Sequence, residues 1–198
     1  RIMSLWGATD SDESKPKNLT TAEKKQVFAN SSGWVLEAGS SLSGNDNTSA
    51  TPEVLVAIGG LATSIGAADV TEVEWITTAA DKSAGFTLSV RVRYNEAVTV
   101  TGSPTLAVTN GNQGSGSGRG PHTLVYASGT GTNELIFNLA IAAANAATNA
   151  DDVLSIGAQN VLKPGGATIK DTAGTNSDSA VAISGAQGTA AGTLTVVA

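Results

Sequence analysis

The sequence predicts an all-β protein, an antiparallel β-sandwich preceded by an extended N-terminal arm with a short helix. Three observations lead to this prediction. Charged residues make up only 14% of the chain and glycine is frequent, with 23 residues, which is typical of short strands joined by tight turns. From about position 71, apolar residues recur at every second position between Gly, Asn, Asp and Pro. Before that point apolar residues are sparse and charges of both signs lie close together.

An N-terminal docking arm or small subdomain is predicted to span residues 1–70. Thr20 followed by Glu23 has the spacing of a capping box. The stretch "TAEKKQVFA" contains good helix formers, so we expect a helix of about two turns there. Farther along, "GWVLEAGS" and "EVLVAIGGL" are expected to form two short strands, separated by the loop "SSLSGNDNTSATP".

The sandwich is predicted to span residues 71–198, and its first long strand alternates most clearly. In "FTLSVRVRY" one face carries only apolar and aromatic side chains, which we expect in the core: Phe86, Leu88, Val90, Val92 and Tyr94. The other face carries Thr87, Ser89, Arg91 and Arg93. The two arginines have a spacing that could grip an acidic neighbour, although a solvated face is the simpler interpretation.

Eight further runs repeat this alternation: "AVTVTG", "TLAVTNG", "TLVYASG", "ELIFNLAI", "DVLSIGAQNVL", "ATIKD", "AVAISG" and "GTLTVVA". About eight short strands at such spacing are typical of a sandwich of the immunoglobulin type. The stretch "IAAANAATNADD" is rich in alanine but lacks a long apolar stripe. We interpret it as the end of a strand followed by a loop, with one helical turn as an open alternative.

Charge and composition exclude several classes of partner. The net charge of -6 and the pI near 4.6 argue against nucleic acid, which needs a dense basic surface. The absence of cysteine excludes a disulfide framework and a thiolate metal site. No apolar run approaches the roughly 18 residues of a membrane span, and no charged start leads into an apolar signal region. We therefore expect no membrane segment and, in the chain as given, no secretion signal.

The glycine run "GNQGSGSGRGPH" does not have the pattern of a phosphate loop. Such a loop needs a helix directly after the glycines, whereas Pro121 and the strand "TLVY" follow here. We expect a long flexible hairpin loop, whose Arg119 and His122 could touch a neighbouring subunit or a host glycan. His122 is the only histidine, and a flexible loop is a poor scaffold for catalysis. We therefore expect no catalytic residue, no cofactor and no enzymatic activity.

The carboxylate pairs are also interpreted as solvated. Glu72 and Glu74 share one face at a strand start, and Asp151 and Asp152 are adjacent in a turn. An alternative is a calcium ion held by Asp151, Asp152 or Asp171 with loop carbonyls, because hard cations favour oxygen ligands. No ligand spacing resembles an EF-hand loop, so no metal site is predicted.

Three runs in the second half of the chain carry a resemblance to a known family. They are "NEAVTVTGSPTLAVTNG", "LVYASGTGTNELIFNLAI" and "DDVLSIGAQNVLKPGGATIKDTAG". In this order they resemble the bacterial Ig-like repeat found in large surface proteins of bacteria and in their phages, over roughly residues 71–198. The preceding segment, with "SLWGATDSDESKPKNLTTAEKKQVF", "GWVLEAGS" and "EVLVAIGGL", resembles the start of structural proteins in tailed phages of marine cyanobacteria.

This combination implies a virion protein on the outer surface of the particle. The resemblance implies capsid decoration or cementing, with a neck or tail position as a close alternative. The expected partners are the major capsid protein or other virion proteins, together with other copies of this chain. The arm would lie across subunit boundaries and could lend "GWVLE" or "EVLVAI" to a neighbour's sheet edge. A surface adhesin that binds glycan is the alternative from another class, but the aromatic residues of the second half fall mostly at inward positions.

An arm with few apolar residues tends to fold on a partner, because it cannot recover its ordering entropy alone. Its buried aromatic and aliphatic side chains would then supply most of the binding energy. The predicted anchors are Leu5, Trp6, Phe28, Trp34, Val35 and Leu36. The alternative is that these aromatic side chains pack against the chain's own sandwich. For Trp34 and Phe28 this alternative is given the same weight as contact with a partner, and for Trp6 it is given less.

Overall fold

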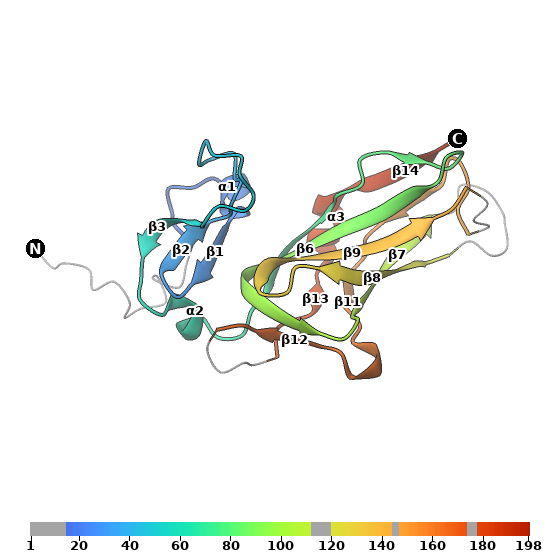
Figure 1. The fold of residues 1–198 in the computed structure, drawn as a ribbon. Helices are drawn as coiled ribbons and strands as arrows, with labels where there is room; N and C mark the ends of the chain where they lie inside the picture. The colour runs from blue at the N-terminus through green and yellow to red at the C-terminus, as the bar shows by residue number, and fades with distance from the viewer. Residues whose placement is uncertain (1–14, 112–119, 144–146, 174–177) are drawn as a thin grey trace, which may run out of the picture.

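The computed structural model describes residues 15–111, 120–143, 147–173 and 178–198. These residues form an N-terminal unit, residues 15–66, beside a larger β-domain that begins at residue 67 (Figure 1). The prediction of a mostly β chain is confirmed. In the described part of the chain, no helix is long and apolar enough to cross a membrane.

The N-terminal unit is a small three-stranded sheet with two single-turn helices. Its elements are α1 (Thr21–Lys24), β1 (Val27–Asn30), β2 (Gly33–Leu36), β3 (Glu53–Ala57) and α2 (Leu61–Ser64). The predicted capping box is confirmed, because the Thr20 hydroxyl accepts from the Glu23 backbone N–H and the Glu23 carboxylate accepts from the Thr20 N–H. The helix is one turn rather than two, because "VFAN" pairs with β2 as a hairpin strand.

The hairpin turn between β1 and β2 depends on glycine. Gly33 has φ +131°, and a Cβ on it would lie 2.0 Å from the Val56 carbonyl oxygen of β3. The sheet and α2 enclose a core of their own, made of Val27, Ala29, Trp34, Leu36, Ile58, Leu61 and Ala62. Residues 15–66 therefore fold on themselves, as the small-subdomain alternative expects and an extended arm does not, because β1, β2 and the segment around α2 supply enough apolar surface for a core.

In its described residues the β-domain has eleven strands and two short helical elements. They are β4 (Val70–Trp75), β5 (Ala80–Asp81), β6 (Phe86–Thr101), β7 (Thr105–Gly111), β8 (His122–Ser128), β9 (Thr132–Ile141), β10 (Val153–Ser155), β11 (Gln159–Asn160), η1 (Pro164–Gly166), β12 (Thr168–Asp171), β13 (Ala182–Ile183), α3 (Gly185–Ala191) and β14 (Thr193–Val197). The main sheet runs in the order β3-β2-β1-β6-β9-β8-β7-β10-β14-β5, while β4 and β12 also pair with β6. It is mixed, since β1 with β6 and β14 with β5 are parallel pairs.

Strand β6 pairs with strands of both parts of the molecule, namely β1 of the N-terminal unit and β9 of the β-domain. The runs "FTLSVRVRY" and "AVTVTG" join into this one strand of 16 residues. Its predicted inward face is confirmed for Leu88, Val90, Val92 and Tyr94, which are buried in the main core. That core gathers side chains from most strands of the β-domain, around which the sheet is rolled. The stretch that follows Ile141 contains neither strand nor helix in its described residues, as predicted.

Candidate functional site

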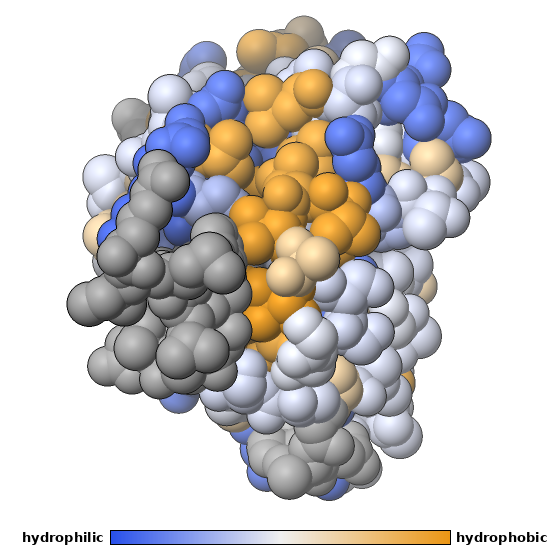
Figure 2. Space-filling model, turned by 90° about the vertical axis from the view of Figure 1, so that its left-hand side faces the viewer, coloured by the Kyte–Doolittle hydropathy of each residue, from blue (hydrophilic) through white to orange (hydrophobic). Residues whose placement is uncertain are grey.

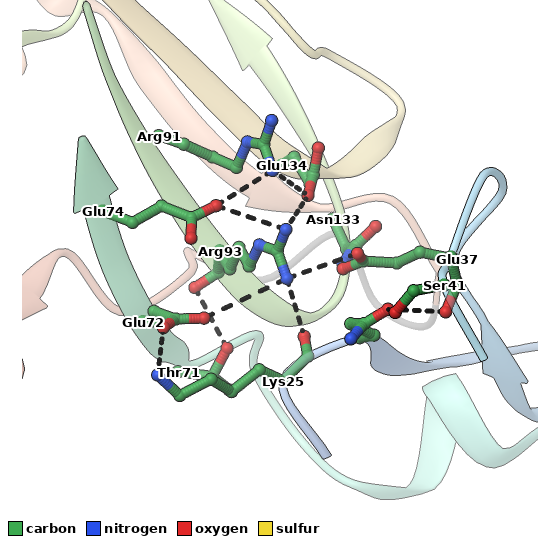
Figure 3. A network of polar contacts seen from close by, with 12 residues as sticks. Lys25, Glu37, Ser41, Thr71, Glu72, Glu74, Arg91, Arg93, Asn133 and Glu134 are labelled. Atoms are coloured by element: carbon green, nitrogen blue, oxygen red, sulfur yellow. Dashed lines mark hydrogen bonds and ion pairs between the residues drawn. The ribbon is translucent and has the colours of Figure 1, made fainter. Parts of the chain in front are cut away.

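The outer face of β6 meets the N-terminal unit in a cluster of ion pairs (Figure 3). We call this cluster the charged joint. Its members are Lys25 and Glu37 from the N-terminal unit, and Glu72, Glu74, Arg91, Arg93 and Glu134 from β4, β6 and β9. The solvated face predicted for the two arginines is wrong. They grip acidic neighbours instead, because the N-terminal unit covers this face.

Arg93 lies at the centre of the charged joint. Its Nη1 is 3.3 Å from a Glu37 carboxylate oxygen and donates to the Lys25 carbonyl at 3.2 Å. Its Nη2 lies 3.2 Å from Glu74 Oε1 and 3.0 Å from Glu134 Oε1. The residue is only 8% exposed. The planar, forked guanidinium suits this arrangement, because it can meet several carboxylates in fixed directions.

The strand register of the β-domain places the partners of both arginines opposite them. Glu74 pairs with Arg91, and Arg93 lies between Glu72 on β4 and Glu134 on β9. Arg91 Nη1 is 2.9 Å from Glu74 Oε1 and 3.3 Å from Glu134 Oε1. Opposite charges on facing strands stabilise the pairing. The prediction that Glu72 and Glu74 are simply solvated is therefore wrong, because both belong to an ion-pair network.

The N-terminal unit contributes the remaining contacts. The Lys25 ammonium pairs with the Glu72 carboxylate. Burial raises the pKa of the Glu37 carboxyl, although Arg93 opposes this shift, and Asn133 Nδ2 donates to Glu37 Oε1 at 2.8 Å. Burial lowers the pKa of Lys15 to about 8, while its Nζ donates to the Lys24 carbonyl at 2.7 Å. The contacts of Lys25 with Glu72 and of Glu37 with Asn133 hold the two parts of the molecule in one orientation.

A cleft of about 810 Å³ opens beside the charged joint. Phe28, Gly39 and Thr48 line it from the N-terminal unit, whereas Thr132 and Asn133 line it from the β-domain. The carboxylates that face it are engaged by arginine or lysine.

The outermost strand of the N-terminal unit is β3 (Figure 1). Its one partner strand among the described residues is β2, so within that part of the chain the backbone groups of its other edge pair with no strand. Val54 and Leu55 on this strand are 47% and 38% exposed. Figure 2 views the molecule from this side and shows an apolar area on it. This edge is suited to pairing with an extended segment of another protein.

The predicted anchor residues lie elsewhere. Phe28, Trp34, Val35 and Leu36 are buried within the chain, which corrects the expectation that they contact a partner. Trp34 and Leu36 belong to the core of the N-terminal unit itself, rather than packing against the sandwich as the alternative expects. Leu5 and Trp6 lie outside the described residues.

The prediction that His122 lies on a flexible loop is wrong, because this residue is the first of β8. It is buried, and its Nε2 lies 3.0 Å from the Thr148 hydroxyl. Burial lowers its pKa. The glycine run at 112–119, with Arg119, lies outside the described residues. The structure therefore gives His122 a structural position at the start of a core strand.

The aspartates considered for calcium lie in different settings. Asp152 is buried and accepts from Asn110 Nδ2 at 2.9 Å and from the Asn149 N–H at 2.8 Å, so it is not solvated as predicted. Asp151 is exposed. Asp171 is buried in β12. Within the described ranges, no three acidic or histidine side chains gather closely enough to ligate one metal ion together.

Comparisons with known proteins found no matching family model, curated protein or solved structure. Function is therefore argued from the charged joint, from the edge of β3 and from the resemblance seen in the sequence.

Proposed function

We propose that this chain is a non-enzymatic structural protein of a phage particle, which decorates or cements the head. It attaches through the N-terminal unit and displays an Ig-like sandwich on the outer surface of the virion. A position at the neck or tail is a close variant of the same proposal. The observation that carries the proposal is the apolar edge of β3 at the far side of the N-terminal unit, which no second strand among the described residues covers.

The edge of β3 supports docking by strand addition. Backbone N–H and C=O groups of an edge strand bond to an extended partner segment, while exposed side chains such as Val54 and Leu55 add apolar contact. Of the two segments considered for strand exchange, "GWVLE" is unsuitable because β2 already lies between β1 and β3. The segment "EVLVAI", which contains β3, remains. Its partner would be the major capsid protein, another virion protein or a second copy of this chain.

The charged joint supports a display role for the β-domain. A flexible tether would let the two parts rotate, whereas Arg93 ties β6 to Glu37 and to the Lys25 carbonyl of the N-terminal unit. The β-domain would then project from the docking edge in a fixed direction. The rolled sheet around one core is compatible with an Ig-like sandwich. Leu5 and Trp6 remain predicted anchors on the particle.

Quantitative mass spectrometry of purified, intact phage particles tests this proposal. A copy number comparable with that of the main shell protein would support head decoration, and a small copy number would support a neck or tail position. Absence from the particles would contradict the proposal and favour a surface-binding module.

The docking edge can be tested with Val54→Lys. A lysine there leaves the fold intact, because the side chain is exposed, but opposes close apolar contact with a partner strand. We expect at least a tenfold loss of binding to particles that lack the protein. Val125→Lys is the matched control, since Val125 is also exposed but lies on β8 of the β-domain. Equal binding of both variants would contradict docking through β3.

A further inference from the structure

The inner face of β6 carries a buried acid that the charged joint does not use. Glu96 lies three residues beyond Arg93 and is 0% exposed. Neither oxygen of its carboxylate has a hydrogen-bond partner in the described structure. A buried carboxyl group without a partner loses its hydration and gains nothing in return, so its position calls for an explanation.

Backbone contacts close a ring of four segments around this position. The segments are β6, residues 68–69, residues 178–180 and β12. The contacts that join them in turn are Asn95 N–H to the Asp69 carbonyl at 3.0 Å, Ala180 N–H to the Ala68 carbonyl at 2.8 Å, Ser179 N–H to the Ile169 carbonyl at 3.0 Å, and Thr172 N–H to the Ala97 carbonyl at 3.0 Å. The ring encloses the end of the core that lies nearest to the N-terminal unit.

Other oxygen atoms belong to this ring. Asp171 pairs with Val98 in the antiparallel register, and Glu96 is two residues from Val98 on the same face of β6. Asp171 is itself buried. The hydroxyl of Ser179 is also buried without a hydrogen-bond partner in the described structure. The side-chain atoms that these residues could offer to a cation are therefore all oxygens.

The electrostatics agree with this geometry. Burial raises the pKa of Glu96 to about 8, and the nearby charges of Asp171 and Asp69 add to the shift. Burial also raises the pKa of Asp171. Two buried carboxylates can ionise together only if a cation neutralises them.

We propose that Glu96 and Asp171 hold a divalent cation inside this ring, with the Ser179 hydroxyl, backbone carbonyls or water completing its coordination. Calcium is the cation that the donors favour, because hard cations of its size take carboxylate, carbonyl and hydroxyl oxygens in flexible geometry. Two side-chain carboxylates balance its charge. This site differs from the turn at Asp151 and Asp152.

The proposed ion would lie at the junction of the two parts of the molecule. Ala29 of β1 pairs with Glu96 itself, and Ala173, just after β12, packs against the core of the N-terminal unit. An ion that ties β6 to β12 would therefore stiffen the platform on which the N-terminal unit sits. Calcium would then strengthen the fold of the full chain.

Calcium titration of the chelator-treated full chain tests the proposal. We expect calcium chloride to raise the melting temperature and to give a saturable heat of binding in isothermal titration calorimetry. Glu96→Gln keeps the size of the side chain and removes its charge, and should lower calcium affinity at least tenfold. Asp171→Asn should do the same, which provides a second variant if the first fails to fold. Asp151→Asn is the control and should bind calcium as the unmodified chain does.

Three results would overturn the proposal. They are no calcium-dependent change in the unmodified chain, unchanged affinity in the folded Glu96→Gln variant, and loss of affinity in Asp151→Asn. The first would mean that Glu96 is held as a neutral acid, and the others that calcium binds elsewhere.

Discussion

The two faces of β6 bury opposite charges in opposite ways. Arg93, on the outer face, contacts Glu37, Glu74 and Glu134 as well as a backbone carbonyl. Glu96, on the inner face, has no hydrogen-bond partner in the described structure. Both side chains are buried, so they lose hydration alike, but only the first recovers that loss through contacts with its neighbours.

This difference indicates a structural role for Arg93 and a ligand-binding role for Glu96. A buried ion with several partners orients the elements that supply them, while its net contribution to stability is modest. A buried ion without partners is costly unless it takes up a proton or a cation. The charged joint thus explains how the N-terminal unit is positioned, whereas Glu96 points to a ligand.

The largest effect in this comparison is expected from Arg93→Met. The substitution keeps the apolar stem of the side chain but leaves the largely buried carboxylates of Glu37 and Glu72 without the guanidinium between them. Breaking a buried ion pair in this way costs about 3 to 5 kcal/mol. We expect a loss of that order in the free energy of unfolding, measured by urea denaturation, with the N-terminal unit released first in limited proteolysis.

Arg91→Met is the matched control for this prediction. Arg91 meets two of the same glutamates, but its side chain is 28% exposed. Water can replace its contacts, so we expect a loss of about 1 kcal/mol or less. Equal losses in the two variants would show that Arg93 is no more central than Arg91.

A smaller effect is expected from Glu96→Gln in the presence of a chelator, and it concerns how the free energy of unfolding depends on pH. The folded pKa of Glu96 is about 8, against 4.5 for the unperturbed group. The folded chain therefore holds a proton that the unfolded chain has lost between these values, so stability falls as pH rises through that window, by at most about 1.4 kcal/mol per pH unit for one proton.

Glu96→Gln should flatten this decline, because the amide does not titrate. The measurement is the free energy of unfolding of both chains at several pH values from 4 to 9, a range chosen to bracket about one pH unit beyond the two pKa values. Parallel curves for the two chains would show that Glu96 keeps an ordinary pKa.

Local periodicity predicted more of the β-domain than of the N-terminal unit. The inward residues of β6 follow from strict alternation, which depends only on the strand itself. Strand β1 was missed because "QVFA" follows good helix formers, and its pairing with β2 decides its conformation. The burial of Trp34 likewise cannot be predicted from the sequence. Its side chain packs in a core with residues of α2, and a helix of only four residues leaves no periodic pattern.

The charged joint shows why side chains on an outward face are difficult to assign. Arg93 sits at a position that a single strand would present to water, but it is buried among residues of both parts of the molecule. The one local signal was the alternation of Glu in "TEVEW" with Arg in "SVRVRY", two complementary patterns on strands that pair. Glu96 carried a signal too, because it occupies an inward position in the alternation of β6.

The smallest effect is expected from Lys15→Gln, at the margin of the charged joint. The folded pKa of Lys15 is about 8, against 10.5 for the unperturbed group. The unfolded chain therefore binds one more proton than the folded chain between these values, so Lys15 makes stability rise with pH in that window. This sign is opposite to that of Glu96.

Lys15→Gln should reduce the slope of stability against pH between about 8 and 10.5, measured by urea denaturation. Lys17→Gln is the control, since Lys17 is exposed and should leave the slope unchanged. A slope that Lys15→Gln leaves as it was would mean that the Lys15 ammonium is hydrated rather than covered by the N-terminal unit. The burial of the joint would then end at Lys25 and Glu37, whose contacts with Glu72, Arg93 and Asn133 join the two parts of the molecule.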